Sequence, residues 1–127
     1  MDRGERPVSI LVYEDDPAWA GALAATLRNC GYTVQIANHF APALEALVAT
    51  SVDLLVADIV VPGGVNGMAL ARMARMRCPS IKTVYVTGHD LGGLDADIDA
   101  PILRKPVSDE RLLDAIRGVL AQPVAQS

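Results

Sequence analysis

The sequence predicts a single α/β domain in which helices cover both faces of a doubly wound sheet of five parallel strands. Short runs of β-branched and other apolar residues alternate with segments of helical periodicity throughout the 127 residues. The third of these runs, residues 52–57, is apolar on both sides except for Asp53, as expected for a strand covered on both faces. The length suits one domain, and 51% apolar residues supply its core.

The first strand and helix are predicted from the segment that ends at Gly31. Residues 8–13 are rich in β-branched side chains and predict a buried strand. Asp16 is expected to cap the following helix, and Pro17 suits its first turn because the missing N–H would have no partner there. Gly31 ends this helix. Its apolar positions recur at helical spacing at Ala20, Leu23, Ala24 and Leu27.

The middle of the chain repeats this pattern. A second strand is predicted over residues 33–37, and Asn38 is expected to cap the helix after it. The third strand, 52–57, is followed by a glycine-containing loop over 62–67 and a helix that ends near Arg77. The apolar face of the second helix is predicted to consist of Phe40, Leu44, Leu47 and Val48.

Two further strands and a helix complete the predicted fold. The strands are expected over residues 83–87 and 102–104. Ser108 can cap the last helix, and the acids that follow it are favoured by the helix dipole. Leu112, Ile116 and Val119 form its buried stripe. We expect the domain to span residues 8–120, with flexible ends at 1–7 and 121–127.

Composition and charge argue against several classes of function. Eleven basic and fifteen acidic residues give a net charge of -4, and no basic run is present, so direct binding to nucleic acid is not expected. The charged N-terminus precedes only the short apolar run 8–13, which predicts neither a signal peptide nor a membrane span and favours a cytoplasmic protein. Cys30 and Cys78 match no metal-ligand spacing and are expected to be free thiols.

The polar residues that follow the predicted strands are the candidate site. Glu14 and Asp15 follow the first strand, Asp58 the third, Thr87 the fourth and Lys105 the fifth. In open parallel sheets ligands bind at the carboxyl ends of the strands. Three acids, a hydroxyl and an amine are therefore expected to converge on one edge of the sheet.

This set of side chains suits magnesium-dependent phosphoryl transfer. Clustered carboxylates need a cation to stay ionised together, and oxygen ligands without Cys or His select a hard ion such as Mg²⁺. Asp15 and Asp58 are candidates for direct ligands, with Glu14 acting through a water. Asp58 is a candidate nucleophile toward phosphorus, assisted by Lys105 and Thr87. Taken singly, these residues also suit a solvated acidic loop, a helix cap and an ordinary Lys-Pro loop.

Four segments around these residues resemble the signature segments of response-regulator receiver domains, the CheY-like signalling family with a flavodoxin-like (βα)5 fold. The resemblance implies that Glu14 and Asp15 are the acidic pair and that Asp58 is the phosphoacceptor. It further implies that the Val60 backbone carbonyl is a Mg²⁺ ligand, that Thr87 is the switch hydroxyl and that Lys105 contacts the phosphoryl group. The segments are residues 10–17, 53–63, 86–88 and 103–106.

The resemblance also implies partners and a mode of action. The phosphoryl donor would be a histidine kinase or a histidine phosphotransfer protein, and the signal would pass to an unknown downstream protein target. Such a domain is a phosphoacceptor with self-catalysed phosphotransfer and dephosphorylation, not a conventional enzyme. A monomer or weak dimer is expected. The sequence leaves open whether the chain is a single-domain regulator or the receiver of a hybrid histidine kinase.

Two departures from the family pattern are present. Ile102 stands where many receivers carry a Tyr or Phe that turns inward, so a Thr–Tyr switch is not expected. The stretch from Thr87 to Lys105 is short and contains Gly92-Gly93, which disfavours a full fourth helix, as in hybrid kinase receivers. Residues 88–100 are therefore predicted to be among the most mobile, with His89 in an exposed loop.

Three rival functions are weighed against this prediction. A pseudo-receiver that docks a partner without phosphorylation would be free to lose the site residues, yet this sequence carries all of them. A Mg²⁺-dependent phosphatase with an aspartyl intermediate often has a second Asp two residues after the nucleophile, where this chain has Val60. A flavin protein of the same fold would not place Glu14, Asp15 and Asp16 where its phosphate binds.

Overall fold

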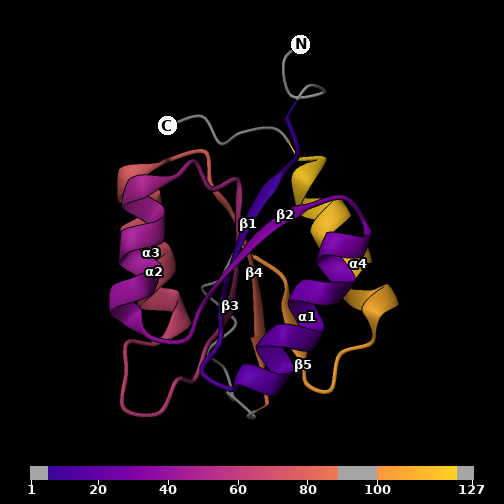
Figure 1. Ribbon diagram of the computed structural model, residues 1–127, viewed down its shortest axis with the longest axis horizontal. Coiled ribbons are helices and arrows are strands. Elements are labelled where there is room, and N and C mark those ends of the chain that lie inside the picture. The colour runs from indigo at the N-terminus through magenta and orange to yellow at the C-terminus, as the bar shows by residue number, and fades with distance from the viewer. Residues whose placement is uncertain (1–5, 89–99, 123–127) are drawn as a thin grey trace.

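The sheet and its two helical layers match the predicted architecture. The computed structural model describes residues 6–88 and 100–122. Five parallel strands lie in the order β2-β1-β3-β4-β5. Figure 1 shows α2 and α3 on one side of the sheet and α1 and α4 on the other. The elements are β1 (Ser9–Tyr13), α1 (Pro17–Asn29), β2 (Thr33–Ala37), α2 (Phe40–Ala49), β3 (Leu54–Asp58), α3 (Gly67–Arg77), β4 (Lys82–Thr87), β5 (Ile102–Arg104) and α4 (Asp109–Leu120).

The strand order reverses direction at β1. From β1 the chain passes to β2 on one side, and then crosses to β3 on the other side of β1. In doubly wound sheets this reversal of direction leaves a binding crevice at the carboxyl ends of the strands. The residues that follow β1 and β3 therefore lie where the fold favours a ligand.

Two apolar cores hold the layers together, one on each face of the sheet. The first core packs α1 and α4 against residues such as Ile10 and Val12, and the second packs α2 and α3 against Leu11 and Tyr13. Alternate residues of β1 thus enter opposite cores, and all five of its residues are buried. This double coverage explains why the central strands are almost continuously apolar.

The predicted helix caps are correct for two helices and wrong for one. The Asp16 carboxylate accepts hydrogen bonds from the N–H groups of the first turn of α1, and Ser108 does the same for α4. Asn38 does not cap α2, because its side-chain amide donates instead to the Glu14 backbone carbonyl at 2.8 Å. His39 occupies the N-cap position of α2 and makes no capping bond with its side chain. Asn38 therefore joins the end of β2 to the end of β1.

The predicted strand and helix limits need small corrections. β3 begins at Leu54 and includes Asp58, because its pairing with β1 starts at Ile10 and its pairing with β4 continues as far as Asp58. β1 begins one residue later than predicted and β4 one residue earlier. The predicted apolar face of α2 was wrong at Val48, which is 58% exposed, and Ala43 is the buried residue instead.

Several predictions concern segments outside the described residues. The expected mobility of residues 88–100 and the placement of His89 depend mainly on residues 89–99, which the structure does not describe. The same holds for most of the predicted flexible ends, at 1–5 and 123–127. In the described part of the chain, no helix combines the length and the apolar character needed to cross a membrane.

Gly67 is where a small substitution should damage the fold most. A Cβ at this first residue of α3 would overlap the Asp58 carbonyl oxygen and lie 3.0 Å from the Ala57 Cβ. We expect Gly67→Ala to lower the free energy of unfolding by about 2 to 3 kcal/mol, because strand backbone has to move. Urea unfolding measures this change. Gly21→Ala is the control, since a Cβ at that exposed position of α1 meets nothing within 4 Å. It should be neutral or stabilising, and equal stability of the two variants would contradict the prediction.

Candidate functional site

Three carboxylates meet at the carboxyl ends of β1 and β3. Glu14, Asp15 and Asp58 each offer an oxygen, and these oxygens lie within 4.8 Å of one another. Glu14 and Asp58 are almost completely buried, whereas Asp15 is exposed. The fold causes this convergence because β1 and β3 are adjacent parallel strands. The structure thus brings together the three acids that the sequence places after the two strands.

Lys105 supplies the positive charge of the cluster. Its Nζ atom donates to Glu14 Oε1 at 2.7 Å and to Asp58 Oδ2 at 3.2 Å. Residue 105 directly follows β5, and its backbone N–H donates to the Thr87 carbonyl at 2.8 Å. One ammonium group therefore bridges the two buried carboxylates.

The remaining oxygens of the buried acids accept backbone hydrogen bonds. Asp58 Oδ1 accepts from the Val60 N–H at 3.1 Å, and Glu14 Oε2 accepts from the Asp16 N–H at 3.0 Å. These bonds fix the orientation of both carboxylates, because each has one oxygen on Lys105 and the other on the backbone that follows its own strand. Each Asp58 oxygen receives one of these bonds and retains a second lone pair.

The charges of the cluster are strongly interdependent. Burial raises the pKa of Glu14, the hydrogen bonds from Lys105 and Asp16 oppose this shift, and the charge of Asp58 adds to it. Burial alone would lower the pKa of Lys105, but its hydrogen bond to Glu14 and the charges of Asp58 and Glu14 outweigh burial and raise it. Lys105 therefore stays an ammonium ion, while a fully ionised set of three acids calls for further positive charge.

Thr87 and Val60 lie at the same edge of the sheet. Thr87 is the last residue of β4, is 1% exposed and stands one residue beyond Val86, the β4 partner of Asp58. Val60 is half-buried in the loop between β3 and α3, and its N–H contacts the Asp58 carboxylate. All the residues predicted for the site are thus found at the carboxyl edge of the sheet.

Trp19 is a neighbour of the site that the sequence analysis missed. The Lys105 Nζ atom lies 5.4 Å from the centre of the Trp19 ring, within the range of a cation–π contact. Trp19 lies in the first turns of α1, four residues after Asp15. The position of the sole tryptophan just after the acidic pair was the available signal, but the sequence did not show that it faces Lys105.

The donor set fits a hard divalent cation. All three clustered side chains present carboxylate oxygens, with no sulfur or imidazole among them. The exposed Asp15 gives access from solvent, and the two buried acids supply negative charge that one ammonium does not balance. Oxygen donors, their separation and their excess charge all favour Mg²⁺.

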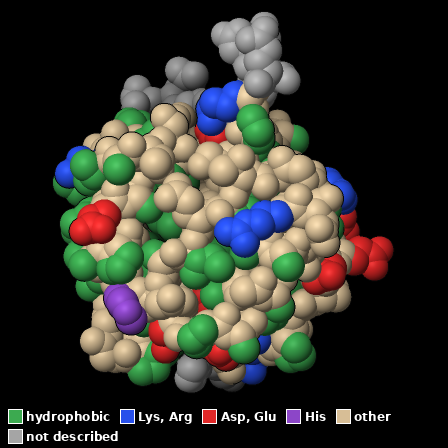
Figure 2. All heavy atoms as spheres, in the orientation of Figure 1, with side chains coloured by type: hydrophobic (Ala, Val, Ile, Leu, Met, Phe, Trp, Pro, Cys, Tyr) green, Lys and Arg blue, Asp and Glu red, His purple; other side chains and the backbone are tan. Residues whose placement is uncertain are grey.

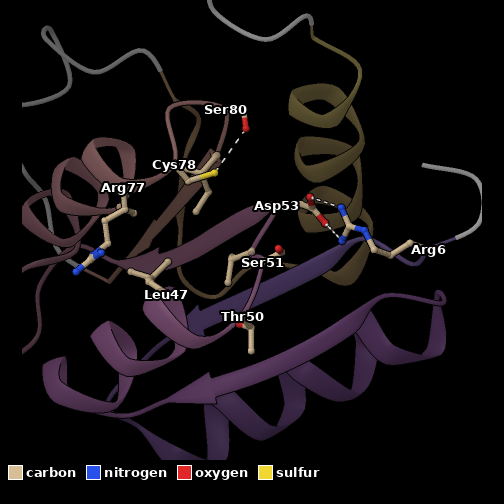
Figure 3. A pocket seen from close by; sticks show the side chains of 11 residues that line it. Arg6, Leu47, Thr50, Ser51, Asp53, Arg77, Cys78 and Ser80 are labelled. Carbon is tan, nitrogen blue, oxygen red and sulfur yellow. Dashed lines mark hydrogen bonds and ion pairs between the residues drawn. The ribbon is translucent and has the colours of Figure 1, made fainter. Parts of the chain in front are cut away.

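A cleft of about 430 Å³ lies at the amino ends of the strands, opposite the acidic cluster. Figure 3 shows Arg6 and Asp53 facing each other there, with guanidinium to carboxylate distances of 3.1 Å. Asp53 also accepts from the Ser9 N–H at 2.8 Å. These contacts connect the segment before β1 to the segment before β3, and they explain the single polar residue in the predicted third strand as a structural anchor distant from the acidic cluster.

The molecular surface carries mixed charge on the face that Figure 2 displays. The Lys and Arg side chains visible there stand apart from one another, and some of them lie beside acidic side chains. Acidic side chains are visible near the lower edge of this view, where Figure 1 places the carboxyl ends of the strands, and others lie at its left and right sides. On this face, the described side chains form no continuous basic surface of the kind that DNA binding requires.

Comparison with known proteins identifies the family. The model of the response regulator receiver domain matches residues 10–117, and the chain belongs to this family. The resemblance drawn from the sequence is thereby confirmed. Receiver domains are signalling domains of two-component systems that in general bind Mg²⁺ through acidic residues and have a histidine kinase as partner. This chain carries such acidic residues, Glu14, Asp15 and Asp58, at the carboxyl ends of β1 and β3.

Individual relatives differ in how much of their length the chain matches. It is 35% identical over 115 residues to the receiver protein CpdR of Brucella abortus (strain 2308), covering 87% of this chain and 95% of CpdR. It is 34% identical over 118 residues to the response regulator MprA of Mycobacterium ulcerans (strain Agy99), covering 89% of this chain and 50% of MprA. The chain therefore spans about half the length of the MprA relatives that it matches.

Solved receiver structures share the fold. A response regulator receiver protein from Sinorhizobium medicae WSM419 aligns with a TM-score of 0.82 at 29% identity, covering 91% of this chain and 96% of that one. A CheY-like receiver domain protein from Methanospirillum hungatei JF-1 aligns with a TM-score of 0.79 at 28% identity, covering 89% and 93%. The predicted five-stranded CheY-like fold is correct.

Proposed function

We propose that this domain accepts a phosphoryl group on Asp58 from a phosphohistidine donor, in a Mg²⁺-dependent reaction, and signals through altered protein–protein interaction. The observation that carries the proposal is the Asp58 carboxylate, 5% exposed, beside two other acids and 3.2 Å from the Lys105 ammonium. The donor would be a histidine kinase or a histidine phosphotransfer protein. The downstream partner would be a protein, reached by a monomer or weak dimer in the cytoplasm.

The proposed reaction begins with attack by an Asp58 oxygen on phosphorus. The new O–P bond forms as the P–N bond to the donor histidine breaks, and the imidazole leaves with the electron pair of that bond. The Val60 N–H and Lys105 hold the carboxylate in place before attack. Lys105 is close enough to exchange one of its carboxylate contacts for a phosphoryl oxygen, which would neutralise charge on the transferred group.

The proposed metal ligands are Glu14, Asp15 and Asp58, with the Val60 backbone carbonyl as a further donor. Asp15 and Asp58 would bind directly, and Glu14, which already pairs with Lys105, would act through a water. When bound, Mg²⁺ would supply positive charge for the phosphoryl oxygens. The separation of the carboxylate oxygens, all within 4.8 Å, supports this set.

Thr87 is the proposed reporter of phosphorylation. Its hydroxyl would donate to a phosphoryl oxygen on Asp58, which pairs with the neighbouring residue of β4. Ile102, at the start of β5, has no polar or aromatic group that could follow such a movement. The signal would therefore leave through the segment that follows Thr87. A docking module without phosphorylation gains no specific support, since the site residues lie together.

Labelling with a small phosphodonor tests this function and its metal requirement. We expect phosphoramidate with Mg²⁺ to add one phosphoryl group to the wild-type protein, and we expect the same incubation with EDTA to add none, because the clustered acids then lack their cation. Intact-mass spectrometry measures both. Equal labelling with and without the chelator would contradict the metal role, and failure to label under any condition would favour the docking module.

A further inference from the structure

Tyr13 connects the site to a loop that is distant in sequence. It is the last residue of β1, directly before Glu14, and its side chain is fully buried in the core that α2 and α3 cover. Its hydroxyl donates to the Val65 backbone carbonyl at 2.6 Å, across 52 positions of the chain. A short bond from a buried phenol to a backbone carbonyl fixes both partners.

The bonded loop is the one that begins immediately after Asp58. It runs over residues 59–66 and carries Val60 near its start. The Ile59 N–H donates to the Val86 carbonyl at 3.0 Å, which joins the start of the loop to β4. The Tyr13 bond joins the far half of the loop to β1. The loop is thus bonded to both of the strands that flank β3.

The loop backbone also passes close to the Tyr13 hydroxyl at Gly64. The same phenol oxygen lies 3.8 Å from the position that a Cβ on Gly64 would occupy, so the loop backbone approaches the ring closely.

We propose that Tyr13 is a positioning residue, whose hydroxyl holds the 59–66 loop against β1 and so presets Val60 beside the acidic cluster. This inference rests on the proposed function, in which the Val60 carbonyl is a metal ligand. The ring fills the core, and the hydroxyl contributes the link to the loop. Removing the oxygen alone should therefore leave the packing intact and release the loop.

The test compares Tyr13→Phe with Tyr85→Phe. Tyr85 is a matched control because it is 3% exposed, lies in the same core and belongs to β4, on the other side of β3. In the metal-free protein, amide exchange of residues 59–66 should become faster in Tyr13→Phe and remain unchanged in Tyr85→Phe. Calorimetric titration with Mg²⁺ should show affinity about tenfold lower in Tyr13→Phe only.

The two readouts separate this inference from the function on which it rests. Unchanged loop exchange in Tyr13→Phe, or equal changes in both variants, would overturn the role of Tyr13 whatever the metal does. Faster loop exchange with unaltered Mg²⁺ affinity would also overturn it, because the loop would then not position a ligand. A wild-type protein that binds no Mg²⁺ would count against the proposed function instead, and the exchange data would still decide whether Tyr13 holds the loop.

Discussion

Asp58→Ala should take up no phosphoryl group from phosphoramidate and Mg²⁺ under conditions in which the wild type is labelled to completion. Asp58 is the buried acid whose two oxygens are held by Lys105 and by the Val60 N–H. Glu14 accepts the same two kinds of bond, with the shorter of the two Lys105 contacts, but it is more deeply buried than Asp58, at 1% against 5% exposed. Asp15 is exposed. Neither neighbour combines a carboxylate of fixed orientation with access for the phosphodonor, and a nucleophile needs both.

Asp53→Ala is the matched control for this experiment. Asp53 lies just before the same strand, at its other end, where it pairs with Arg6. Its loss should lower stability without touching the acidic cluster, so this variant should still be labelled while it remains folded. Intact mass measures all three proteins. Equal labelling of wild type and Asp58→Ala would remove Asp58 from its proposed role.

Lys105→Met should slow labelling by about 10²-fold, the loss typical when one stabilising charge or donor is removed from a polar transition state. The methionine keeps most of the side-chain length but cannot contact Asp58 or a phosphoryl oxygen. Mg²⁺ affinity should stay the same or rise, because the ammonium no longer competes for Glu14 and Asp58. A rate measured by intact mass over time, together with a Mg²⁺ titration, tests both expectations.

Lys82→Met provides the comparison, because Lys82 is the only other lysine of the chain. It begins β4, and its Nζ atom donates to the Gln122 carbonyl at 3.2 Å, at the end of the sheet opposite the acids. Its labelling rate should equal that of the wild type. Equal rates in Lys105→Met and the wild type would mean that Lys105 serves only to balance buried charge. A parallel loss of Mg²⁺ affinity would instead indicate a disturbed site.

The architecture was predictable because the hydrophobic pattern and the polar residues that follow the strands indicate the same fold. The apolar run before Asp58 predicted a strand covered on both faces, which calls for helices on each side of the sheet. Parallel strands then place their carboxyl ends together, so Glu14, Asp15 and Lys105 were expected near Asp58 before any distance was available. The predicted limits of β3 were wrong at both ends, since pairing partners, which the sequence does not show, decide where a strand starts and stops.

The errors and omissions share a physical origin. The Asn38 side chain could cap a helix, but its amide donates to the carbonyl of Glu14, just after the neighbouring strand β1. Tertiary packing determines this partner. The Lys105 ammonium lies over the Trp19 ring, and the Tyr13 hydroxyl donates to the loop after Asp58. Both contacts depend on side-chain directions that are set by the packing of α1 and α3. Local sequence specifies which groups are available. Which partner each group takes depends on residues far away in the chain.

The position of the phosphoryl group tests most directly whether Asp58 is the phosphoacceptor. Borohydride reduction of the labelled wild-type protein converts an aspartate that carries an acyl phosphate into homoserine, and peptide mass mapping then locates it. We expect homoserine at position 58 alone, in samples treated with phosphodonor and Mg²⁺. Homoserine at position 15, or label that resists reduction because it is not an acyl phosphate, would contradict the assignment of Asp58 as the phosphoacceptor.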